Sequence, residues 1–202
     1  MGNLLSVKRA LEHCGALVTV TADPKTILAA PRVVLPGVGA FADGMREMKR
    51  RQLDLVVREI GARGVPLLGI CLGMQMLLEE SEEFGRSAGL GLLPGSVVVI
   101  PTTTFDGGTQ KIPHLGWNSL SYAPGRTSWK GTPLEDVNPG EAVYFVHSFM
   151  ASPSNSALRV ADCFYGAVPV SAAIGRDNIF GCQFHPEKSG ETGLKILKRF
   201  LE

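Results

Sequence analysis

Helical and strand-like segments alternate along residues 4–70, and this alternation limits the fold more than any other feature of the chain. Residues 4–14 have apolar positions at helical spacing, with Asn3 placed to cap the helix and Gly15 placed to end it. Two strand-like runs, a long helical pattern and a buried apolar run then follow in the order 16–21, 32–35, 41–62 and 65–70. Strands that alternate with helices pair in parallel, so we expect an open α/β sheet whose ligands gather at the carboxyl ends of the strands.

The second half of the chain has a different character. Short strand-like runs follow one another with turn signals and almost no helix between them, at residues 96–100, 118–122, 142–149, 159–164, 168–174 and 179–184. Strands without crossover helices pair antiparallel. A last helical pattern covers residues 190–201. We expect an open mixed sheet flanked by helices, with more antiparallel strands in the C-terminal half. The 202 residues, 45% of them apolar, can bury the core of a single domain spanning 1–202.

The start of the chain does not complete the first unit of this α/β fold. A helix that leads into a parallel sheet is the crossover of a βαβ unit, so a strand is expected ahead of it. Only Met1, Gly2 and Asn3 stand there. We therefore expect the N-terminal strand to be absent from this sequence and Met1 to be an internal residue of a longer reading frame.

Charge and cysteine spacing argue against several classes of function. The formal charge is +1, from 20 basic and 19 acidic residues without a long basic stripe, so nucleic acid is not an expected partner. The longest uncharged apolar run, residues 65–78, is too short to span a bilayer, and the N-terminus lacks a secretory signal. We expect a cytoplasmic protein. Its four cysteines have no metal-like spacing, which predicts free thiols and neither metal nor cofactor.

One of these cysteines lies between two glycines at a predicted junction of strand and helix. The stretch Gly69-Ile70-Cys71-Leu72-Gly73 has the form of the nucleophile elbow G-x-S-x-G, with sulfur in place of the hydroxyl. Such a turn has a strained backbone, and side chains at the glycine positions would collide with neighbouring elements. The first N–H groups of a helix that begins at Leu72 would favour a thiolate on Cys71. The pattern alone suits a buried cysteine at a tight turn equally well.

The motif FHPEK, at the end of a predicted strand, adds two further residues to this candidate site. Residues two apart in an extended segment share a face, so His185 and Glu187 lie side by side as a base and a carboxylate able to fix its tautomer. With Cys71 they would form a catalytic triad. An H-x-E motif is common, and His185 could simply cap the strand with Glu187 in water; the pairing with the elbow favours the triad.

An oxyanion hole is the remaining requirement, and the stretch LPGVG at residues 35–39 offers one at the end of another strand. Its glycines, Gly37 and Gly39, leave backbone N–H groups free to face a ligand and allow a peptide to flip. We choose the N–H groups of Val38 and Leu72 as donors. Taken alone, the same stretch also reads as an ordinary turn.

These three motifs, P-G-x-G, G-x-C-x-G-x-Q and H-P-E, resemble in this order those of the class I (triad) glutamine amidotransferases, and the similarity spans most of the chain. The resemblance implies hydrolysis of glutamine to glutamate and ammonia through a thioester on Cys71, with His185 as general base and acid. Gln75 is similar to the residue that holds the substrate, beside Gly37 and Gly39. Glu83 resembles the residue near the substrate amino group, although by pattern it could be a solvated acidic helix end.

Four further stretches, MGNL, PHLGWN, YFVHS and HPEKS, resemble the glutaminase subunits of imidazole glycerol phosphate synthases, which serve histidine biosynthesis. The resemblance implies a heterodimer in which ammonia passes to a (βα)₈ synthase partner that closes the imidazole ring on a nucleotide substrate. Asn3, Trp117, Tyr144 and Lys188 match positions that face this partner. Without the resemblance, Trp117 reads as a core aromatic and Lys188 as a surface charge.

The resemblance has one departure and leaves two other functions open. The family normally begins with a strand and a D-Y-G-like turn before MGNL, and this sequence starts at the methionine. One alternative is a glutaminase of another class I amidotransferase, which the stretch PHLGWN disfavours. The other is a non-catalytic member of the fold, which the presence of all three triad residues disfavours.

Overall fold

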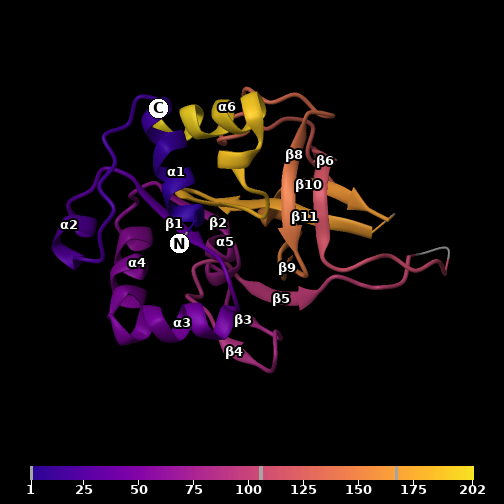
Figure 1. Ribbon diagram of the computed structural model, residues 1–202, viewed down its shortest axis with the longest axis horizontal. Helices are drawn as coiled ribbons and strands as arrows, with labels where there is room; N and C mark the ends of the chain where they lie inside the picture. The colour runs from indigo at the N-terminus through magenta and orange to yellow at the C-terminus, as the bar shows by residue number, and fades with distance from the viewer. Residues whose placement is uncertain (1, 105–106, 167) are drawn as a thin grey trace.

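A six-stranded mixed sheet forms the centre of the computed structural model, which describes residues 2–104, 107–166 and 168–202 (Figure 1). Its strands lie in the order β1-β2-β12-β11-β10-β7. The three parallel strands are β1 (Val33–Gly37), β2 (Leu67–Cys71) and β12 (Ile179–Cys182). The three that pair antiparallel are β11 (Val168–Arg176), β10 (Arg159–Tyr165) and β7 (Ser121–Tyr122). The open mixed sheet with its antiparallel C-terminal half is therefore confirmed.

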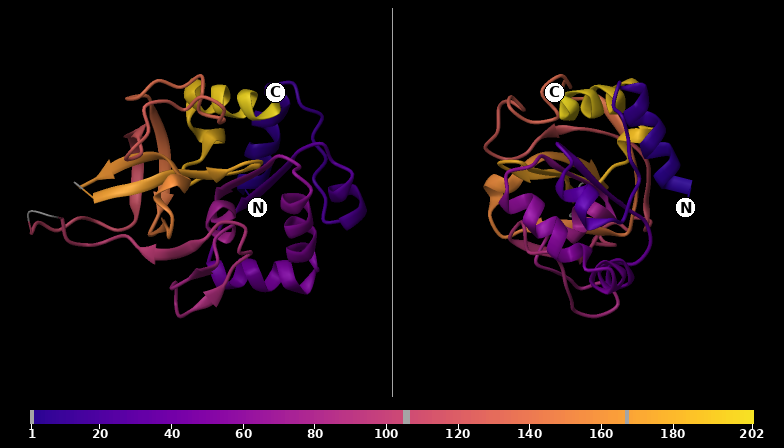
Figure 2. Two further views of the ribbon diagram at one scale, coloured as in Figure 1. Left: turned by 180° about the vertical axis from the view of Figure 1, so that it is seen from behind. Right: turned by 90° about the vertical axis from the view of Figure 1, so that its left-hand side faces the viewer.

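Helices cover both faces of this sheet, as Figure 1 and Figure 2 show. One face carries α1 (Gly2–His13) and α6 (Gly190–Leu201), and the other carries α3 (Phe41–Arg50), α4 (Leu53–Ala62) and α5 (Leu72–Met76). Side chains alternate along β2, so Leu68 and Ile70 pack with α1 and α6, whereas Leu67 packs with α3 and α4. The core thus forms two layers with the sheet between them.

Two smaller sheets accompany the six-stranded sheet. One holds β4 (Ser87–Ala88), β3 (Glu80–Ser81), β5 (Gly95–Val99) and β9 (Phe149–Pro153) in this order. The other pairs β6 (His114–Ser119) antiparallel with β8 (Ala142–His147). The remaining elements are α2 (Pro24–Leu28), η1 (Ser156–Leu158) and η2 (Pro186–Lys188). In the view of Figure 1, β6 and β8 stand upright across the six-stranded sheet.

The prediction of a strand at residues 16–21 is wrong. This segment follows α1 without secondary structure, and Leu17 and Val20 point to solvent, with 104% and 49% of their surface exposed. A strand needs a neighbour for its backbone hydrogen bonds, and none of the described strands pairs with this segment. The opening helix also begins at Gly2, ahead of the expected residue 4, so Asn3 lies inside its first turn and not at the predicted N-cap position.

The single helix expected at residues 41–62 is two helices, α3 and α4. The chain turns at Gln52, whose φ is 58°. A straight helix of this length would extend about 33 Å, far beyond the five-residue strands it must cover, which are about 17 Å long. The break lets both halves bury their apolar faces, formed by Phe41, Met45 and Met48 in α3 and by Val56, Val57 and Ile60 in α4.

Two predicted strands, 118–122 and 142–149, are each divided between two sheets. The chain leaves β6 at Ser119 and enters the large sheet at Ser121. Leu120, between them, is buried and donates its backbone N–H to the carbonyl of Glu141. It leaves β8 at His147 and enters the four-stranded sheet at Phe149. The other predicted strands and the last helix are confirmed, with ends shifted by up to a few residues. Among the described residues, no helix has the length and apolarity to cross a membrane.

Candidate active site

Cys71 is the last residue of β2, and α5 begins at the next residue. Its φ of 55° and ψ of −110° lie in a region that non-glycine residues rarely occupy. The flanking glycines make the turn possible. A Cβ on Gly73 would lie 1.7 Å from the carbonyl oxygen of Leu35, and one on Gly69 would lie 2.8 Å from the backbone of Gly73. The structure therefore gives Cys71 the strained junction that the glycine pattern predicts.

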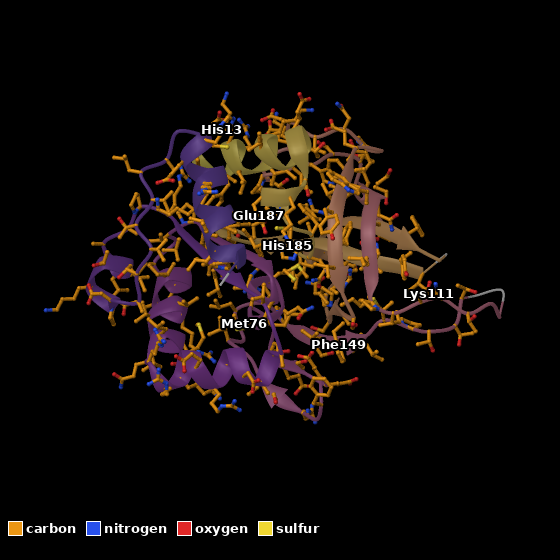
Figure 3. The ribbon with its side chains drawn as sticks, in the orientation of Figure 1. His13, Met76, Lys111, Phe149, His185 and Glu187 are labelled. Carbon is orange, nitrogen blue, oxygen red and sulfur yellow. The ribbon has the colours of Figure 1, made fainter. Side chains whose placement is uncertain are left out.

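His185 and Glu187 lie beside this junction because β12, three residues ahead of His185, runs next to β2. Nδ1 of His185 is 2.8 Å from Oε1 of Glu187, and the two side chains are 2% and 0% exposed. His185 also forms a side-chain hydrogen bond with Cys71. Figure 3 shows the labelled pair at the centre of the molecule, between α1 and β8. The structure brings the three predicted triad residues together, and their catalytic role stays a prediction.

The surroundings of His185 favour its charged form. Burial lowers the pKa of this imidazole, but hydrogen bonds with Cys71 and Glu187 outweigh burial and raise the pKa to about 9. A cationic imidazole stabilises a neighbouring thiolate. Since Nδ1 contacts Glu187, Nε2 is the ring nitrogen available to exchange a proton with the sulfur.

The other three cysteines are free thiols in settings that suppress reactivity. Burial raises the pKa of Cys163 to about 12 and that of Cys182 well above its usual value. The pKa of the partly buried Cys14 is also raised by burial. A raised pKa leaves less thiolate, so these three thiols are poor nucleophiles.

The predicted oxyanion turn packs against the start of α5. Gly37 stands opposite Cys71 in the β1–β2 ladder, and a Cβ on Gly37 would lie 3.0 Å from Cβ of Leu72. Gly39 has a φ of 98°, which glycine adopts without strain. Val38, between the two glycines, is 58% exposed. Val38 directly follows the end of β1 and Leu72 begins α5 directly after Cys71, and their assignment as oxyanion donors stays a prediction.

Two buried glutamine side chains connect to the sulfur. Nε2 of Gln75 donates to the carbonyl oxygen of Phe149 and to Oε1 of Gln183, both at 3.0 Å. Gln183 donates from Nε2 to Sγ of Cys71 at 3.7 Å. Gln183 was not among the residues predicted from sequence, although a polar residue two positions before His185 in an apolar strand was a usable signal. Gln75 therefore acts on the surroundings of Cys71 through Gln183, and its contact with substrate stays a prediction.

Glu83 lies near the oxyanion turn. Its carboxylate accepts a hydrogen bond from the backbone N–H of Phe41, the first residue of α3. This contact holds the carboxylate at the positive end of the helix, three residues along the chain from Val38. Glu83 follows the short strand β3, so the alternative of a solvated helix end is wrong. Its role near a substrate amino group stays a prediction.

Three of the four predicted interface residues lie together. The rings of Trp117 and Tyr144 make an edge contact at 6.0 Å between centroids, and Nζ of Lys188 is 5.9 Å from the Tyr144 ring. Trp117 is 55% exposed, so its interpretation as a core aromatic is wrong. The side chain of Asn3, the fourth residue, lies outside the described residues.

The serine of HPEKS ties this aromatic pair to the triad segment. Oγ of Ser189 accepts from the backbone N–H of Tyr144 and donates to the carbonyl of His185. The N–H of His185 donates to the carbonyl of Tyr144. Tyr144 and His185 are therefore fixed to each other through their backbones.

A hollow of about 630 Å³ lies away from this site, at the amino ends of β2 and β12. Its walls include Pro66, Asn178 and Phe200, and it contains none of the predicted site residues. Cys71 lies at the other end of β2, so this hollow is not part of the candidate active site.

The geometry around Cys71 suits attack on a carbonyl carbon. A thiol paired with an imidazole and a carboxylate is an activated nucleophile. Backbone N–H groups of a strand-end turn and of a helix start can stabilise the negative oxygen of a tetrahedral intermediate. This arrangement supports acyl transfer through a thioester.

Comparisons with known proteins agree with this chemistry. Residues 2–202 match the family described as glutamine amidotransferase class-I. The chain is 48% identical over 202 residues to the imidazole glycerol phosphate synthase subunit HisH 1 of Legionella pneumophila (strain Lens), covering all of this chain and 95% of that protein. It is 46% identical to subunit HisH of Moorella thermoacetica (strain ATCC 39073 / JCM 9320), covering all of this chain and 90% of that protein.

Two solved structures show the same fold. A crystal structure of a glutamine amidotransferase superimposes with a TM-score of 0.70 at 16% identity, covering 98% of this chain and 93% of that one. The structure of PurLQS from Thermotoga maritima gives a TM-score of 0.65 at 20% identity, covering 97% and 90%. At these identities the likeness concerns the fold alone.

Proposed function

The chain belongs to the class I glutamine amidotransferases, which hydrolyse glutamine, and we propose from this premise that it is the glutaminase subunit of an imidazole glycerol phosphate synthase. Its relatives of 46–48% identity carry that subunit's name over the full length of this chain. The observation that carries the proposed mechanism is the buried contact of His185 with Glu187 beside the strained turn of Cys71.

The proposed reaction has two stages. The Cys71 thiolate attacks the carboxamide carbon of glutamine, and His185 gives its proton to the departing amine, so that ammonia and a glutamyl thioester form. His185 then takes a proton from water, which attacks the thioester and releases glutamate while the thiolate re-forms. Glu187 keeps the proton of His185 on Nδ1 and stabilises its charged form, a role supported by the 2.8 Å contact.

In this proposal, the remaining predicted residues stabilise the tetrahedral intermediates or hold the substrate. The N–H groups of Val38 and Leu72 bind the negative oxygen of the tetrahedral intermediates. Gln75 and Glu83 hold the glutamine chain, together with the backbone at Gly37 and Gly39. Support comes from the packing of Gly37 against Leu72 and from the position of Glu83 near the same turn.

We propose that the partner is a (βα)₈ synthase that receives the ammonia. Support comes from an exposed apolar surface on one side of β6 and β8, here called the outer face and formed by Leu115, Trp117, Tyr144 and Val146. Leu115, Trp117 and Val146 are 60%, 55% and 37% exposed. Lys188 adds a positive charge beside Tyr144. Clustered exposed aromatic and aliphatic side chains are typical of protein interfaces.

Glutamine hydrolysis with and without the synthase subunit and its nucleotide substrate tests this function. We expect slow hydrolysis by the chain alone and stimulation on the order of tenfold or more in the liganded complex. The physical reason is the glycine-flanked peptide at residues 37–38, which flips into the oxyanion orientation when the partner is liganded. The matched controls are Cys71→Ala, which should abolish hydrolysis, and Cys182→Ala, which should not. Equal rates for the free chain and the complex would contradict partner gating.

A further inference from the structure

Two histidines that the glutaminase mechanism does not use lie buried on the inner face of β6 and β8. His114 and His147 stand opposite each other in the ladder and are 1% and 6% exposed. His114 is stacked between the rings of Phe145 and Tyr165, with centroids 4.6 and 4.2 Å away. Stacking on both sides holds this imidazole in one orientation.

Hydrogen bonds fix the proton positions on both rings. Nδ1 of His147 is 2.8 Å from the carbonyl oxygen of Phe149, which only accepts, so Nδ1 carries a proton. In a neutral ring Nε2 then accepts, and His114 donates to it from Nδ1 at 2.9 Å. Nε2 of His114 accepts from the side-chain amide of Asn118 at 3.1 Å. In each of these three hydrogen bonds, the donor lies on the Asn118 side and the acceptor on the Phe149 side.

Both rings are neutral in this arrangement. A proton on Nε2 of His147 would face the N–H of His114, and one on Nε2 of His114 would face the amide of Asn118. Burial lowers the pKa of His114 to about 4. Burial also lowers the pKa of His147 to about 3, assisted by the charges of His114 and His185 and opposed by the bond to Phe149.

The carbonyl of Phe149 connects this pair to the nucleophile. It also accepts from Nε2 of Gln75, whose other amide hydrogen is donated to Gln183. Gln183 donates to the sulfur of Cys71. Figure 3 shows Phe149 near the lower end of β8, below His185 in that view. An unbroken series of hydrogen bonds therefore runs from Asn118 to Cys71.

We propose that His114 and His147 are positioning residues for glutamine hydrolysis, which fix the Phe149 carbonyl and, through it, the two glutamine side chains around the Cys71 sulfur. The proposal rests on the proposed function, since it needs Cys71 as the nucleophile. A fixed carbonyl holds Gln75 in place because an amide with two engaged hydrogens has no freedom to turn. The histidines act through these neighbours and do not touch the substrate.

The same strands connect this series to the partner surface. Side chains alternate along a strand, so Leu115 and Val146, the neighbours of the two histidines, lie on the outer face. The two histidines and the outer face therefore lie on opposite sides of the same two paired strands.

Two substitutions at one position and a matched control test the proposal. His147→Leu removes the donor to Phe149, His147→Asn retains an amide donor near the position of Nδ1, and Val143→Ala removes apolar packing from the same face of β8 without breaking a side-chain hydrogen bond. For each variant, kcat and KM of glutamine hydrolysis are measured in the complex with the synthase subunit. The rate of Cys71 alkylation by iodoacetamide is measured alongside, because it does not depend on glutamine binding.

We expect His147→Leu to lower kcat about tenfold, the rate effect of one lost buried hydrogen bond. KM should stay within about twofold, and alkylation of Cys71 should change with kcat. His147→Asn should recover most of the loss. Val143→Ala should lose thermal stability and keep kcat. This split between stability and kcat separates positioning from a merely structural role.

Three results would overturn the proposal: an unchanged kcat in His147→Leu, an equal loss of kcat in Val143→Ala, or no recovery in His147→Asn. If His147→Leu does not fold, Asn118→Ala at the half-buried far end replaces it, and an unchanged kcat there overturns the proposal. Failure of the proposed function is distinguishable, because the parent complex would then not hydrolyse glutamine, or Cys71→Ala would hydrolyse it as fast as the parent.

Discussion

Replacing Gly73 by alanine tests whether the position of the α5 start controls catalysis. The new Cβ would lie 1.7 Å from the carbonyl oxygen of Leu35, whereas 3.0 Å is the closest approach that such atoms tolerate. The start of α5 or the end of β1 must therefore move by at least about 1.3 Å. Backbone atoms are on both sides of this contact, so no side-chain rotation relieves it. Both the sulfur of Cys71 and the N–H of Leu72 would be displaced.

We expect Gly73→Ala to lower kcat/KM for glutamine about 100-fold or more, the usual effect of a displacement near 1 Å at reacting groups. Overpacking costs about 1–3 kcal/mol, against a total stability of about 5–15 kcal/mol, so the variant should still fold. Steady-state hydrolysis and urea denaturation measure the two effects separately.

Gly61→Ala in α4 is the matched control. Its Cβ would lie 2.9 Å from Cδ2 of Leu92, the end of a flexible side chain that can rotate away. Alanine also favours a helix over glycine by about 1 kcal/mol, so activity and stability should remain close to those of the parent. Activity of Gly73→Ala within tenfold of the parent would refute the reasoning from the Leu35 contact.

Three further predictions concern the triad and the interface. Glu187→Gln should lower kcat by about 10²–10⁴-fold, because the amide no longer stabilises a charged His185; hydrolysis assays at pH 7 check this, and a loss below tenfold would contradict it. The folded pKa of His185, about 9, exceeds its usual 6.5, so its protonation adds stability on the order of 3 kcal/mol, which is complete below pH 6.5 and lost as the pH rises through 9. Urea titrations at pH 6 and 9 should therefore differ more in the parent than in Glu187→Gln, and equal differences would argue against the pair. Trp117→Ala and Lys188→Ala should weaken binding to the synthase subunit or uncouple the two reactions, and Trp117→Ala should lower the affinity by at least about tenfold. The free energy of unfolding should change by less than about 0.5 kcal/mol. Calorimetric titration that shows unchanged affinity, together with unchanged coupling, would mean that both residues are ordinary surface residues.

Sequence alone predicted the parts of the site that depend on local geometry. The glycines around Cys71 follow from steric limits within one turn, and the structure has the close contacts they relieve. The pairing of His185 with Glu187 follows from the two-residue repeat of an extended segment, and their nitrogen and oxygen lie 2.8 Å apart. The helical pattern at residues 190–201 and the apolar strand pattern ahead of Cys71 likewise need no knowledge of distant neighbours.

Features that depend on distant neighbours could not be predicted in this way. The helix breaks at Gln52 because a single straight helix would extend beyond the ends of the strands it covers. The division at Leu120 depends on which strands β6 and β7 pair with, and those strands lie far away in sequence. The strand expected at residues 16–21 lacks a paired neighbour among the described strands. Gln183 gains its role from Gln75, which is 108 positions away in sequence and meets it only in the fold.

The central claim is that Cys71 is the nucleophile of a glutaminase, and covalent labelling tests it most directly. The chain, in complex with the synthase subunit, is treated with a glutamine analogue that carries an electrophile at the position of the carboxamide, and the modified residue is located by mass spectrometry. We expect a single adduct on Cys71, prevented by excess glutamine and absent from Cys71→Ala. Labelling of Cys14, Cys163 or Cys182 in place of Cys71, or glutamine hydrolysis by Cys71→Ala within tenfold of the parent, would contradict the claim.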